Sequence, residues 1–395
     1  MTDRRLIDDL LIGAVEVLPE GALEAKLDLA EREGRPLRVK LGVDPTAPDI
    51  HLGHTVVLNK LRQFQEAGHV AVLIIGDYTA RIGDPSGRSK TRPRLDGAVI
   101  DANAKTYQDQ AFLILDDDPA RLEVRHNGEW LAPLTSEQIF ELTSTTTVAR
   151  ILERDDFAKR WAAHQPISLL EMLYPLAQGY DSVAVEADIE LGGTDQKFNL
   201  LLGRDIQRDY GQSEQVILTL PLLTGTDGER KMSKSFGNYI GITEPPEQIY
   251  GKTLSIPDES LVLWYELLLD SEPPADLPPR DAKRALARQL VARFHGAEAA
   301  GAAEAAFDRQ FIHHGIPDEL PEVQWPRDGG VIHLPALLAE AFGISTSEAR
   351  RTIAQGGVKL DGQPVANGSL DLDAAEIDGK VLQVGKRRFA RVTLV

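Results

Sequence analysis

The chain has 395 residues, which exceeds one ordinary hydrophobic core and predicts two or three domains. It contains no cysteine, so disulfides and thiolate metal sites are excluded and a reducing compartment is expected. The formal net charge of -18 disfavours a general polyanion binder, because the summed field would repel a phosphate backbone. Any contact with nucleic acid must therefore use a local basic patch.

Hydropathy predicts a protein without membrane segments. The hydrophobic content of 42% is normal for a globular protein. The charged N-terminus lacks the apolar core of a signal peptide, and no apolar run reaches membrane-spanning length. The strongest run, residues 70–75, predicts a buried parallel strand. We therefore expect a cytoplasmic protein whose partners include neither a membrane nor DNA.

Residues 38–66 predict a strand, a turn and a helix, in the order of a nucleotide-binding α/β unit. The strand covers 38–43, the turn contains Asp44 and Thr46, and the helix begins near Gly53. Such a helix N-terminus directs backbone N–H groups and the positive end of the helix dipole at a ligand, which favours a phosphate. The next strand ends in the turn-rich segment 82–88, so the ligand is expected at the carboxyl ends of a parallel sheet.

His51 and His54 lie three residues apart at the start of this helix, so both side chains face the same way and can donate to phosphate oxygens. Gly53 between them leaves room for a purine or a ribose against the backbone. A zinc pair and two surface histidines are the alternative interpretations. No cysteine exists and nothing nearby supplies a clear third metal ligand, so no metal site is predicted.

The middle of the chain predicts a helical insertion followed by the second half of the sheet. Residues 100–165 have an amphipathic helical pattern, 168–178 form a further helical segment, and 215–220 predict a strand. Residues 231–235, Lys-Met-Ser-Lys-Ser, follow a turn at Asp227 and Gly228. Alone, this stretch is typical of a solvated loop. After Asp-Ile-His-Leu-Gly-His at 49–54, it instead predicts an ATP site that activates a carboxylic acid.

Changes in composition predict the domain boundaries. Residues 1–243 form the catalytic domain, with its insertion at about 100–165, and 244–314 form a helical domain. Residues 315–330, rich in Pro, Gly and acids, are the expected linker, and 331–395 predict a compact α+β module. From Lys380 onward the module is basic and carries no acid, which indicates either phosphate contacts or a basic edge strand that resists pairing.

Further residues carry a resemblance to a known family. Tyr174, Gln178 and Asp181 recur at helix spacing, and residues 192–196 read Gly-Gly-Thr-Asp-Gln. Together with the two signature segments, they make the chain resemble the bacterial tyrosyl-tRNA synthetases, of class I, over essentially its whole length. The tryptophanyl enzymes are the closest rival, but they typically lack Gln at position 178 and differ around 192–196. Residues 347–351, 356–358 and 385–389 match the RNA-binding module with which the tyrosyl family commonly ends.

The resemblance implies a Rossmann-like parallel-sheet catalytic domain with a helical insertion, an α-helical domain that binds the anticodon arm, and a small C-terminal α+β RNA-binding module. It implies a homodimer that activates L-tyrosine with ATP, giving tyrosyl-adenylate and pyrophosphate, and then transfers tyrosine to the 3′-terminal ribose of tRNA(Tyr). Mg²⁺ is expected to accompany ATP, bound largely through phosphates and water, without a dedicated protein site.

Carried over position by position, the resemblance assigns residues to each part of the reaction. Asp181 takes the hydrogen of the substrate phenol, Gln196 lies near the substrate carboxylate, and Asp195 lies on the ribose hydroxyls. The ammonium group is held by Tyr174, Gln178 and Asp84, and the nucleotide set also includes Asp44, Gly53, Gly192 and Gly193. The groups acting on the phosphates are Thr46, His51, His54, Lys231, Lys234, Arg88 and Arg92, and those contacting RNA are Arg350, Arg351, Lys386, Arg387 and Arg388.

One position departs from the family pattern. Many members place a Tyr that shares the phenol with the Asp where this chain has Lys40. Lys40 is expected to donate to the phenol oxygen, to pair with Asp181, or to turn away. The mechanism needs no general base, because the tyrosine carboxylate is already ionised at neutral pH. Catalysis is therefore expected to rest on positioning and on stabilising the charge that accumulates on the phosphates.

Two other classes of protein fit part of the pattern. A small nucleotidyltransferase shares the His-x-Gly-His site, but such chains are usually shorter and lack both the Gln178 and Asp181 helix and the terminal module. A catalytically idle paralogue that only binds RNA would usually have lost one of the signature residues, which are all present here. Amino-acid-dependent exchange of pyrophosphate into ATP separates these alternatives.

Overall fold

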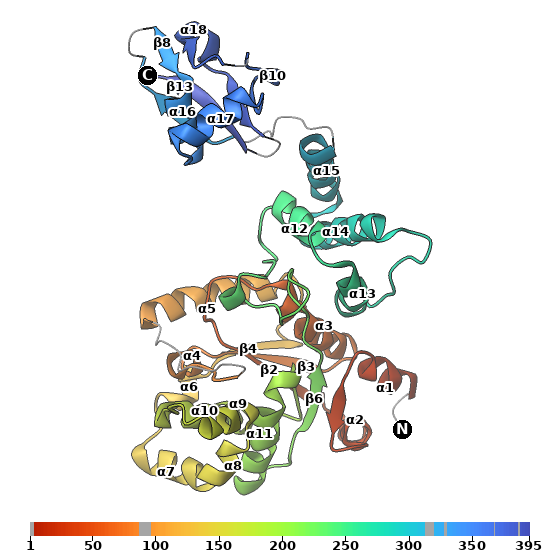
Figure 1. Ribbon diagram of the computed structural model, residues 1–395. Helices are drawn as coiled ribbons and strands as arrows, with labels where there is room; N and C mark the ends of the chain where they lie inside the picture. Colours follow the sequence, from red (N-terminus) through yellow and green to blue (C-terminus); the bar gives the residue numbers. More distant parts are fainter. Residues whose placement is uncertain (1–3, 87–95, 313–319, 328–329, 367, 386–387) are drawn as a thin grey trace. The chain divides into compact units, whose positions relative to one another are not determined.

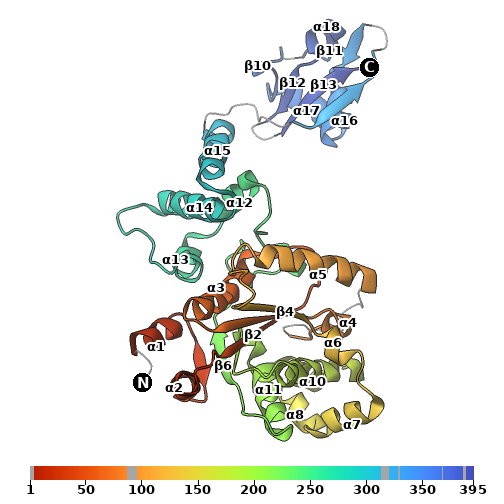
Figure 2. The same ribbon diagram turned by 180° about the vertical axis from the view of Figure 1, so that it is seen from behind.

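The computed structural model describes residues 4–86, 96–312, 320–327, 330–366, 368–385 and 388–395. The chain forms two compact units, Met1–Ala287 and Arg288–Val395, drawn as ribbons in Figures 1 and 2. Helix α14 (Pro279–His295) begins in the first unit and ends in the second.

A six-stranded sheet forms the centre of the first unit, with the strands in the order β1-β6-β5-β2-β3-β4. Its strands are β1 Glu16–Leu18, β2 Arg38–Val43, β3 Val70–Ile75, β4 Leu122–His126, β5 Ile189–Gly193 and β6 Val216–Leu220. Strands β2 to β6 run parallel, whereas β1 pairs antiparallel with β6 at one edge. The side chains of β3 and β6 are almost all buried, as expected for a parallel sheet covered on both faces.

Helices cover both faces of this sheet: α3 (Leu52–Glu66) and α5 (Gly97–Ala111) lie on one face, and α10 (Leu169–Ala184) and α11 (Lys197–Asp209) on the other (Figures 1 and 2). The other helices of this unit are α1 Arg4–Leu11, α2 Ala22–Glu33, α4 Thr79–Ile82, α6 Gly128–Leu131, α7 Ser136–Ser144, α8 Val148–Leu152, α9 Asp155–Ala162, α12 Pro246–Leu254 and α13 Leu261–Leu269. Three short 3₁₀ turns in the described chain are η1 Thr194–Gln196, η2 Lys234–Phe236 and η3 Asp258–Ser260.

Local sequence fixes where α10 begins and how closely it packs. Ser168 caps the helix, accepting from Leu170 N at 3.2 Å, and Glu171 returns a bond to Ser168 N at 2.9 Å. This reciprocal pair is a capping box, which satisfies backbone N–H groups that the first turn leaves unpaired. A Cβ at Gly179 would lie 2.6 Å from Ile206 Cδ1 on α11. The glycine therefore lets α10 approach α11 without displacing the Ile206 side chain.

Two stretches differ from the sequence prediction. Residues 100–165 are not wholly helical, because β4 lies within them and pairs parallel with β3. Only Leu122 of β4 is buried, and such a half-exposed edge strand with charged residues gives a weak apolar signal. The expected linker 315–330 contains β7 (Glu322–Trp325), which pairs parallel with β13 (Arg388–Leu394). β7 is a short edge strand with alternating partial exposure, so its composition resembles a loop.

The second unit holds a helical segment and a small α+β module. The segment comprises α15 (Ala297–Phe307) and the π-helical turn η4 (Asp308–Ile312). The module has a five-stranded sheet, β10-β9-β12-β13-β7, and a two-stranded sheet, β11-β8. Its remaining elements are β8 Val331–His333, α16 Leu334–Phe342, α17 Thr346–Ala354, β9 Val358–Leu360, β10 Gln363–Pro364, β11 Asp371–Asp373, α18 Ala374–Ile377 and β12 Val381–Val384. Buried Leu337, Ile353 and Leu382 belong to one apolar core.

None of the helices in the described parts of the chain is both long and apolar enough to span a membrane.

Candidate active site

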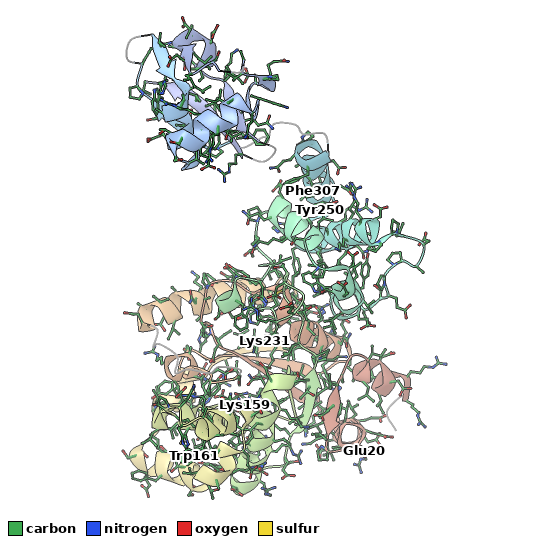
Figure 3. All side chains as sticks on the ribbon, in the orientation of Figure 1. Glu20, Lys159, Trp161, Lys231, Tyr250 and Phe307 are labelled. Atoms are coloured by element: carbon green, nitrogen blue, oxygen red, sulfur yellow. The ribbon has the colours of Figure 1, made fainter. Side chains whose placement is uncertain are left out.

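A cavity of about 800 Å³ opens in the first unit at the carboxyl ends of β2 and β5. Its walls also include the start of α3, the inner face of α10 and the segment around Lys231, which is labelled in Figure 3. The predicted residues that line it are Asp44, Thr46, His51, Gly53, His54, Asp84, Tyr174, Gln178, Asp181, Gly192, Gly193, Asp195, Gln196, Lys231 and Lys234. Lys40 is absent from the lining, and Arg88 and Arg92 lie outside the described residues.

The two histidines at the start of α3 are neutral donors. The Nδ1 of His51 accepts from Gly53 N, and the Nδ1 of His54 accepts from His51 N, each at 3.2 Å. Burial lowers the pKa of His51 well below its ordinary value and that of His54 to about 4, with Lys234 adding to both shifts. Since a nitrogen that accepts carries no hydrogen, each neutral ring bears its hydrogen on Nε2.

Gly53 is required by this arrangement. A Cβ there would lie 3.0 Å from the His51 ring and 3.4 Å from Met232 Cβ. The glycine thus makes room first for the capping histidine, a reason different from the purine or ribose contact predicted from sequence.

Two lysines reach the cavity from the segment that follows Asp227. Lys231 Nζ lies 2.7 Å from Asp195 Oδ2, and Lys234 Nζ donates to the carbonyl of Asp49 and lies 5.5 Å from the Tyr107 ring centroid. Burial lowers the pKa of Lys234 to about 8. Asn238, which sequence reasoning missed, holds this segment by accepting from Ser233 N at 2.8 Å.

Two glycines, Gly192 and Gly193, end β5 just before Asp195. A Cβ on Gly193 would lie 2.6 Å from Leu222 Cδ2 and 2.8 Å from Asp195 Oδ1. A Cβ on Gly192 would lie 3.1 Å from Leu200 Cδ1. Gly193 therefore leaves space beside the Asp195 carboxylate, and Gly192 leaves space for Leu200 and Gln196.

Asp181 occupies the deep end of the cavity on α10. Its Oδ1 accepts from Trp130 Nε1 at 2.8 Å, and its Oδ2 accepts from Asn127 Nδ2 at 3.3 Å. Burial raises the pKa of this carboxyl to about 7, while the charge of Lys40 and these two bonds oppose the rise. Asn127 and Trp130 follow β4, which the sequence analysis did not recognise as a strand. These two site residues were therefore missed as well.

Lys40 turns away from the cavity and pairs with a neighbouring strand. It is fully buried, and its Nζ lies 2.7 Å from Glu190 Oε1, 2.8 Å from Ser182 Oγ and 3.1 Å from the Gln178 carbonyl. Register explains the pair, since Lys40 on β2 stands directly opposite Glu190 on β5. This geometry corresponds to the third of the three expectations for Lys40.

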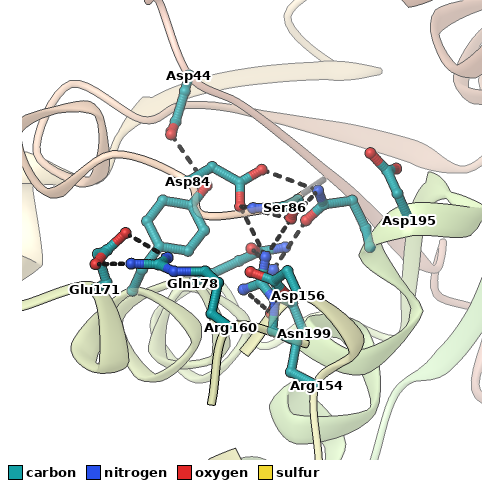
Figure 4. Close-up of polar contacts among 12 residues, drawn as sticks. Asp44, Asp84, Ser86, Arg154, Asp156, Arg160, Glu171, Gln178, Asp195 and Asn199 are labelled. Atoms are coloured by element: carbon teal, nitrogen blue, oxygen red, sulfur yellow. Dashed lines mark hydrogen bonds and ion pairs between the residues drawn. The ribbon is translucent and has the colours of Figure 1, made fainter. Parts of the chain in front are cut away.

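Asp84 lies beside the middle of α10 in a polar network shown in Figure 4. Its Oδ1 accepts from Ser86 N at 2.8 Å, and its Oδ2 accepts from Gln196 Nε2 at 3.1 Å. Burial alone would raise the pKa of Asp84, but the Arg154 charge and the bonds from Ser86 and Gln196 hold it below its ordinary value. Asp84 is therefore an ionised acceptor at the cavity wall.

Gln178 is oriented by Asn199, whose Nδ2 donates to Gln178 Oε1 at 2.8 Å and to Gln196 Oε1 at 2.9 Å. Sequence reasoning missed Asn199 and Arg154. A lone Asn on a helix and an Arg at a helix start are normally solvent-exposed, so neither gives a signal without the tertiary contacts.

Asp44 holds a neighbouring side chain. Its Oδ2 accepts from the Tyr174 hydroxyl at 3.0 Å and its Oδ1 from Thr79 Oγ1 at 2.7 Å. A Cβ on Gly76 would lie 2.1 Å from Asp44 Oδ1, so this contact also depends on a glycine that sequence reasoning missed. Thr46, two residues after Asp44, donates its N–H to the Asp44 carbonyl at 2.8 Å.

The predicted RNA-contacting residues lie in the second unit. Arg350 and Arg351 are exposed on α17, and Arg388 is exposed at the start of β13. Lys386 and Arg387 lie outside the described residues. Within the described chain, no group of three or more His, Asp or Glu side chains is placed to hold a metal ion.

Comparison with known proteins matches two parts of the chain. Residues 32–311 match the family described as tRNA synthetases class I (W and Y), and residues 334–376 match the S4 domain. A tyrosine–tRNA ligase of Moorella thermoacetica is 53% identical over 392 residues, covering 96% of this chain and 94% of that protein. A tyrosine–tRNA ligase of Geobacter sulfurreducens is 51% identical over 393 residues, covering 96% of each.

Among solved structures, the fold is shared with more distant proteins. A tyrosyl-tRNA synthetase of Archaeoglobus fulgidus, complexed with L-tyrosine, has a TM-score of 0.60 at 24% identity, covering 75% of this chain and 99% of that one. A C-terminally truncated mitochondrial tyrosyl-tRNA synthetase of Aspergillus nidulans has a TM-score of 0.62 at 21% identity, covering 78% and 93%.

Proposed function

The chain belongs to the tyrosyl-tRNA synthetases, among the class I tRNA synthetases, and from this membership we propose how its own residues divide the reaction. Its activity is that of the family: it joins L-tyrosine to tRNA(Tyr) at the expense of ATP. The observation that carries the proposal is a single cavity with a buried carboxylate at one end and paired histidines and lysines at the other.

We propose that Asp181 receives the phenol of tyrosine. Trp130 and Asn127 donate one bond to each of its oxygens, so each oxygen keeps a lone pair for a further donor. A hydroxyl satisfies that acceptor, whereas phenylalanine would leave it unpaired in a buried site. Lys40 does not share the phenol in this proposal, because its ammonium group is committed to Glu190, Ser182 and a backbone carbonyl.

The ammonium group is assigned to Asp84, Gln178 and Tyr174. Asp84 supplies the negative charge, and Gln178 Oε1 and the Tyr174 hydroxyl oxygen supply neutral acceptors on the same face of α10. Gln196, which already donates to Asp84, is assigned to the substrate carboxylate.

For the phosphates, neutral His51 and His54 offer Nε2–H donors, and Lys234 offers a positive charge. The tyrosine carboxylate attacks the α-phosphorus of ATP and pyrophosphate leaves, so negative charge accumulates where these donors lie. Thr46 lies on the same wall of the cavity. We propose that Asp195 binds the ribose hydroxyls, which requires Lys231 to leave Asp195 and turn to the phosphates.

Mg²⁺ is proposed to enter with ATP, held by phosphate oxygens and water, and no residue of the chain is assigned to it. In the second step, a terminal ribose hydroxyl of tRNA(Tyr) attacks the carbonyl carbon of tyrosyl-adenylate, and AMP leaves. We also propose that residues 244–314 form a helical domain that binds the anticodon arm of the tRNA.

We also propose that the chain acts as a homodimer in the cytoplasm. Helices α7 to α10 expose large apolar side chains, among them Phe140, Trp161 and Leu169, the last with 80% of its surface accessible. We propose that these side chains belong to one contiguous apolar patch, the kind of surface that marks a protein interface. Sedimentation velocity should therefore give a dimer for the native chain and a monomer for Leu169→Glu. A native chain that sediments as a monomer would contradict the proposal.

The pKa of Asp181, about 7, predicts the pH dependence of tyrosine use. Below pH 7 the carboxyl is protonated and loses the charge that favours it as acceptor, so kcat/KM for tyrosine in pyrophosphate exchange should rise as the pH passes upward through about 7. His51 and His54 stay neutral across this window and add no step, whereas Lys234, with a pKa of about 8, loses its charge above it and limits the rise. Asp181→Asn should remove the step and reduce the preference for tyrosine over phenylalanine by roughly 10- to 100-fold, because a bond to a charged group is worth about 1.5–3 kcal/mol.

Lys40→Met is the companion variant for this test. The Lys40 charge lowers the pKa of Asp181, so its loss should move the step to higher pH. The preference for tyrosine at alkaline pH should persist, since Lys40 does not line the cavity. If the pH profile of kcat/KM of the native chain is the same for tyrosine and phenylalanine, Asp181 does not recognise the phenol.

Lys234→Ala should slow formation of tyrosyl-adenylate while leaving tyrosine affinity nearly unchanged, because the charge acts on the leaving pyrophosphate. Loss of one such electrostatic contact slows related reactions by roughly 10²- to 10³-fold. Single-turnover kinetics measures the step. Lys197→Ala is the control, since Lys197 pairs with Glu16 and does not line the cavity. Equal rates in both variants would exclude Lys234 from the phosphate site.

A chain ending at residue 312 should keep pyrophosphate exchange but charge tRNA poorly. The cut falls there because β7 belongs to the terminal sheet. In the full chain, replacing Arg350, Arg351 or Arg388 by Ala should each flatten the salt dependence of tRNA binding by about 0.7–0.9 in slope, one phosphate contact each. Arg327→Ala is the control, because Arg327 pairs with Asp378 at 3.0 Å. If tRNA charging and the salt slopes are unchanged, the basic strand is only an edge strand of the module and does not contact tRNA.

A further inference from the structure

Arg154 is a buried cation at the base of the amino-acid end of the cavity. It precedes α9, and only 4% of its surface is accessible. Its Nε donates to Asp156 Oδ1 at 2.7 Å, its Nη1 to Asn199 Oδ1 at 3.1 Å, and its Nη2 to Asp84 Oδ1 at 3.2 Å and Ser86 Oγ at 2.5 Å. The guanidinium also lies 5.4 Å from the Phe157 ring centroid. Figure 4 shows Arg154 directed at this group of acceptors.

The contacts of Arg154 lead to two of the three side chains assigned to the substrate ammonium, Asp84 and Gln178. Asp84 is bonded directly, and Gln178 is reached through Asn199, which accepts from Arg154 and donates to Gln178 Oε1. A guanidinium is planar and donates along fixed directions, so it can set the orientation of two acceptors at once. Lysine carries the same charge but lacks this fixed fork.

The charges around Arg154 leave the site negative. Asp84 and Asp156 both pair with it, so this cluster carries one net negative charge before substrate binds. Among the described residues, the Tyr174 hydroxyl is a further titratable group near Asp84, and it donates to Asp44. Burial already raises the pKa of Asp156, which Arg154 opposes. Without Arg154, the carboxylates of Asp84 and Asp156 would share no cation, and protonation of Asp84 would remove the charge that binds an ammonium.

We propose that Arg154 is a positioning residue for the substrate ammonium, fixing the orientation of Asp84 and Gln178 and keeping Asp84 ionised, without touching tyrosine itself. The inference rests on the proposed assignment of the ammonium to Asp84. Arg154 lies between α8 and α9, whereas the other residues of the ammonium site come from α10 and from the loops at the carboxyl ends of the strands.

A second buried arginine, on the helix that follows Arg154, provides a matched control. Arg160 has 2% of its surface accessible and lies 5.9 Å from the same Phe157 ring. It pairs with Glu171 at 2.9 Å, at the start of α10 and outside the cavity lining. Arg160→Met therefore removes an equally buried ion pair from the same region without altering the proposed ammonium site.

The test measures equilibrium binding of two tyrosine analogues to the full chain. Tyramine keeps the phenol and the ammonium, and 3-(4-hydroxyphenyl)propionate keeps the phenol and the carboxylate. Arg154→Met should weaken tyramine by roughly tenfold or more, and the propionate much less, because a bond to a charged group is lost only for tyramine. The ratio of the two affinities should recover as the pH is raised in Arg154→Met but stay flat in the native chain. The ratio cancels the titration of Asp181, which both phenols contact.

Arg160→Met should change both affinities by the same factor. If Arg154→Met also changes them by the same factor, Arg154 only supports the fold and the inference is overturned. Should Arg154→Met fail to fold, Arg154→Lys is measured in its place. The affinity for tyramine relative to the propionate must then fall, because lysine lacks the planar set of donors that the guanidinium provides. An unchanged ratio overturns the inference.

Asp84→Asn separates this inference from the proposed function. If it leaves tyramine binding unchanged, the ammonium assignment itself fails and Arg154 loses its role with it. If it weakens tyramine while Arg154→Met does not, the assignment stands and only the role of Arg154 falls.

Discussion

Every charge buried around the tyrosine end of the cavity has to be paired, and the arrangement of the site follows from those pairs. An unpaired ion in a low-dielectric interior either destabilises the fold by several kcal/mol or loses its charge. Lys40 pairs with Glu190 across two strands, and Arg154 pairs with Asp84 and Asp156. Asp181 has no such ion-pair partner within 4.0 Å among the described residues, and its pKa rises to about 7.

Buried ion pairs are weak contributors to stability, since apolar replacements of similar volume are often as stable. In this chain, the buried ion pairs fix the positions of neighbouring side chains. Lys40 holds the Gln178 carbonyl from one side while Asn199 and Arg154 hold the Gln178 side chain from the other. In the proposed assignment, the hydrogen bonds that hold the amino-acid end of the cavity join protein groups to one another and need no substrate, which reduces the entropy lost on binding. The phosphate end differs in the proposed mechanism, because there Lys231 exchanges its bond to Asp195 for one to a phosphate.

The sequence predicted the fold class and the family, and both are confirmed. It also predicted fifteen of the residues that line the cavity, because short motifs such as His51 to His54 and the spacing of Tyr174, Gln178 and Asp181 report one face of a helix. What it missed depends on contacts between distant segments. Strands β4 and β7 are short edge strands whose identity comes from their partners. Arg154 and Asn127 are 70 and 54 positions away from the carboxylates that they contact.

The claim that the amino-acid end is organised before substrate binds is tested most directly by crystal structures of the full chain with and without L-tyrosine. The account predicts that Asp84, Gln178 and Asp181 keep their bonds to Arg154, Asn199 and Trp130 in both structures, and that the ammonium lies against Asp84. Side chains of these residues that are disordered or differently bonded without tyrosine, and become ordered only in the complex, would contradict it.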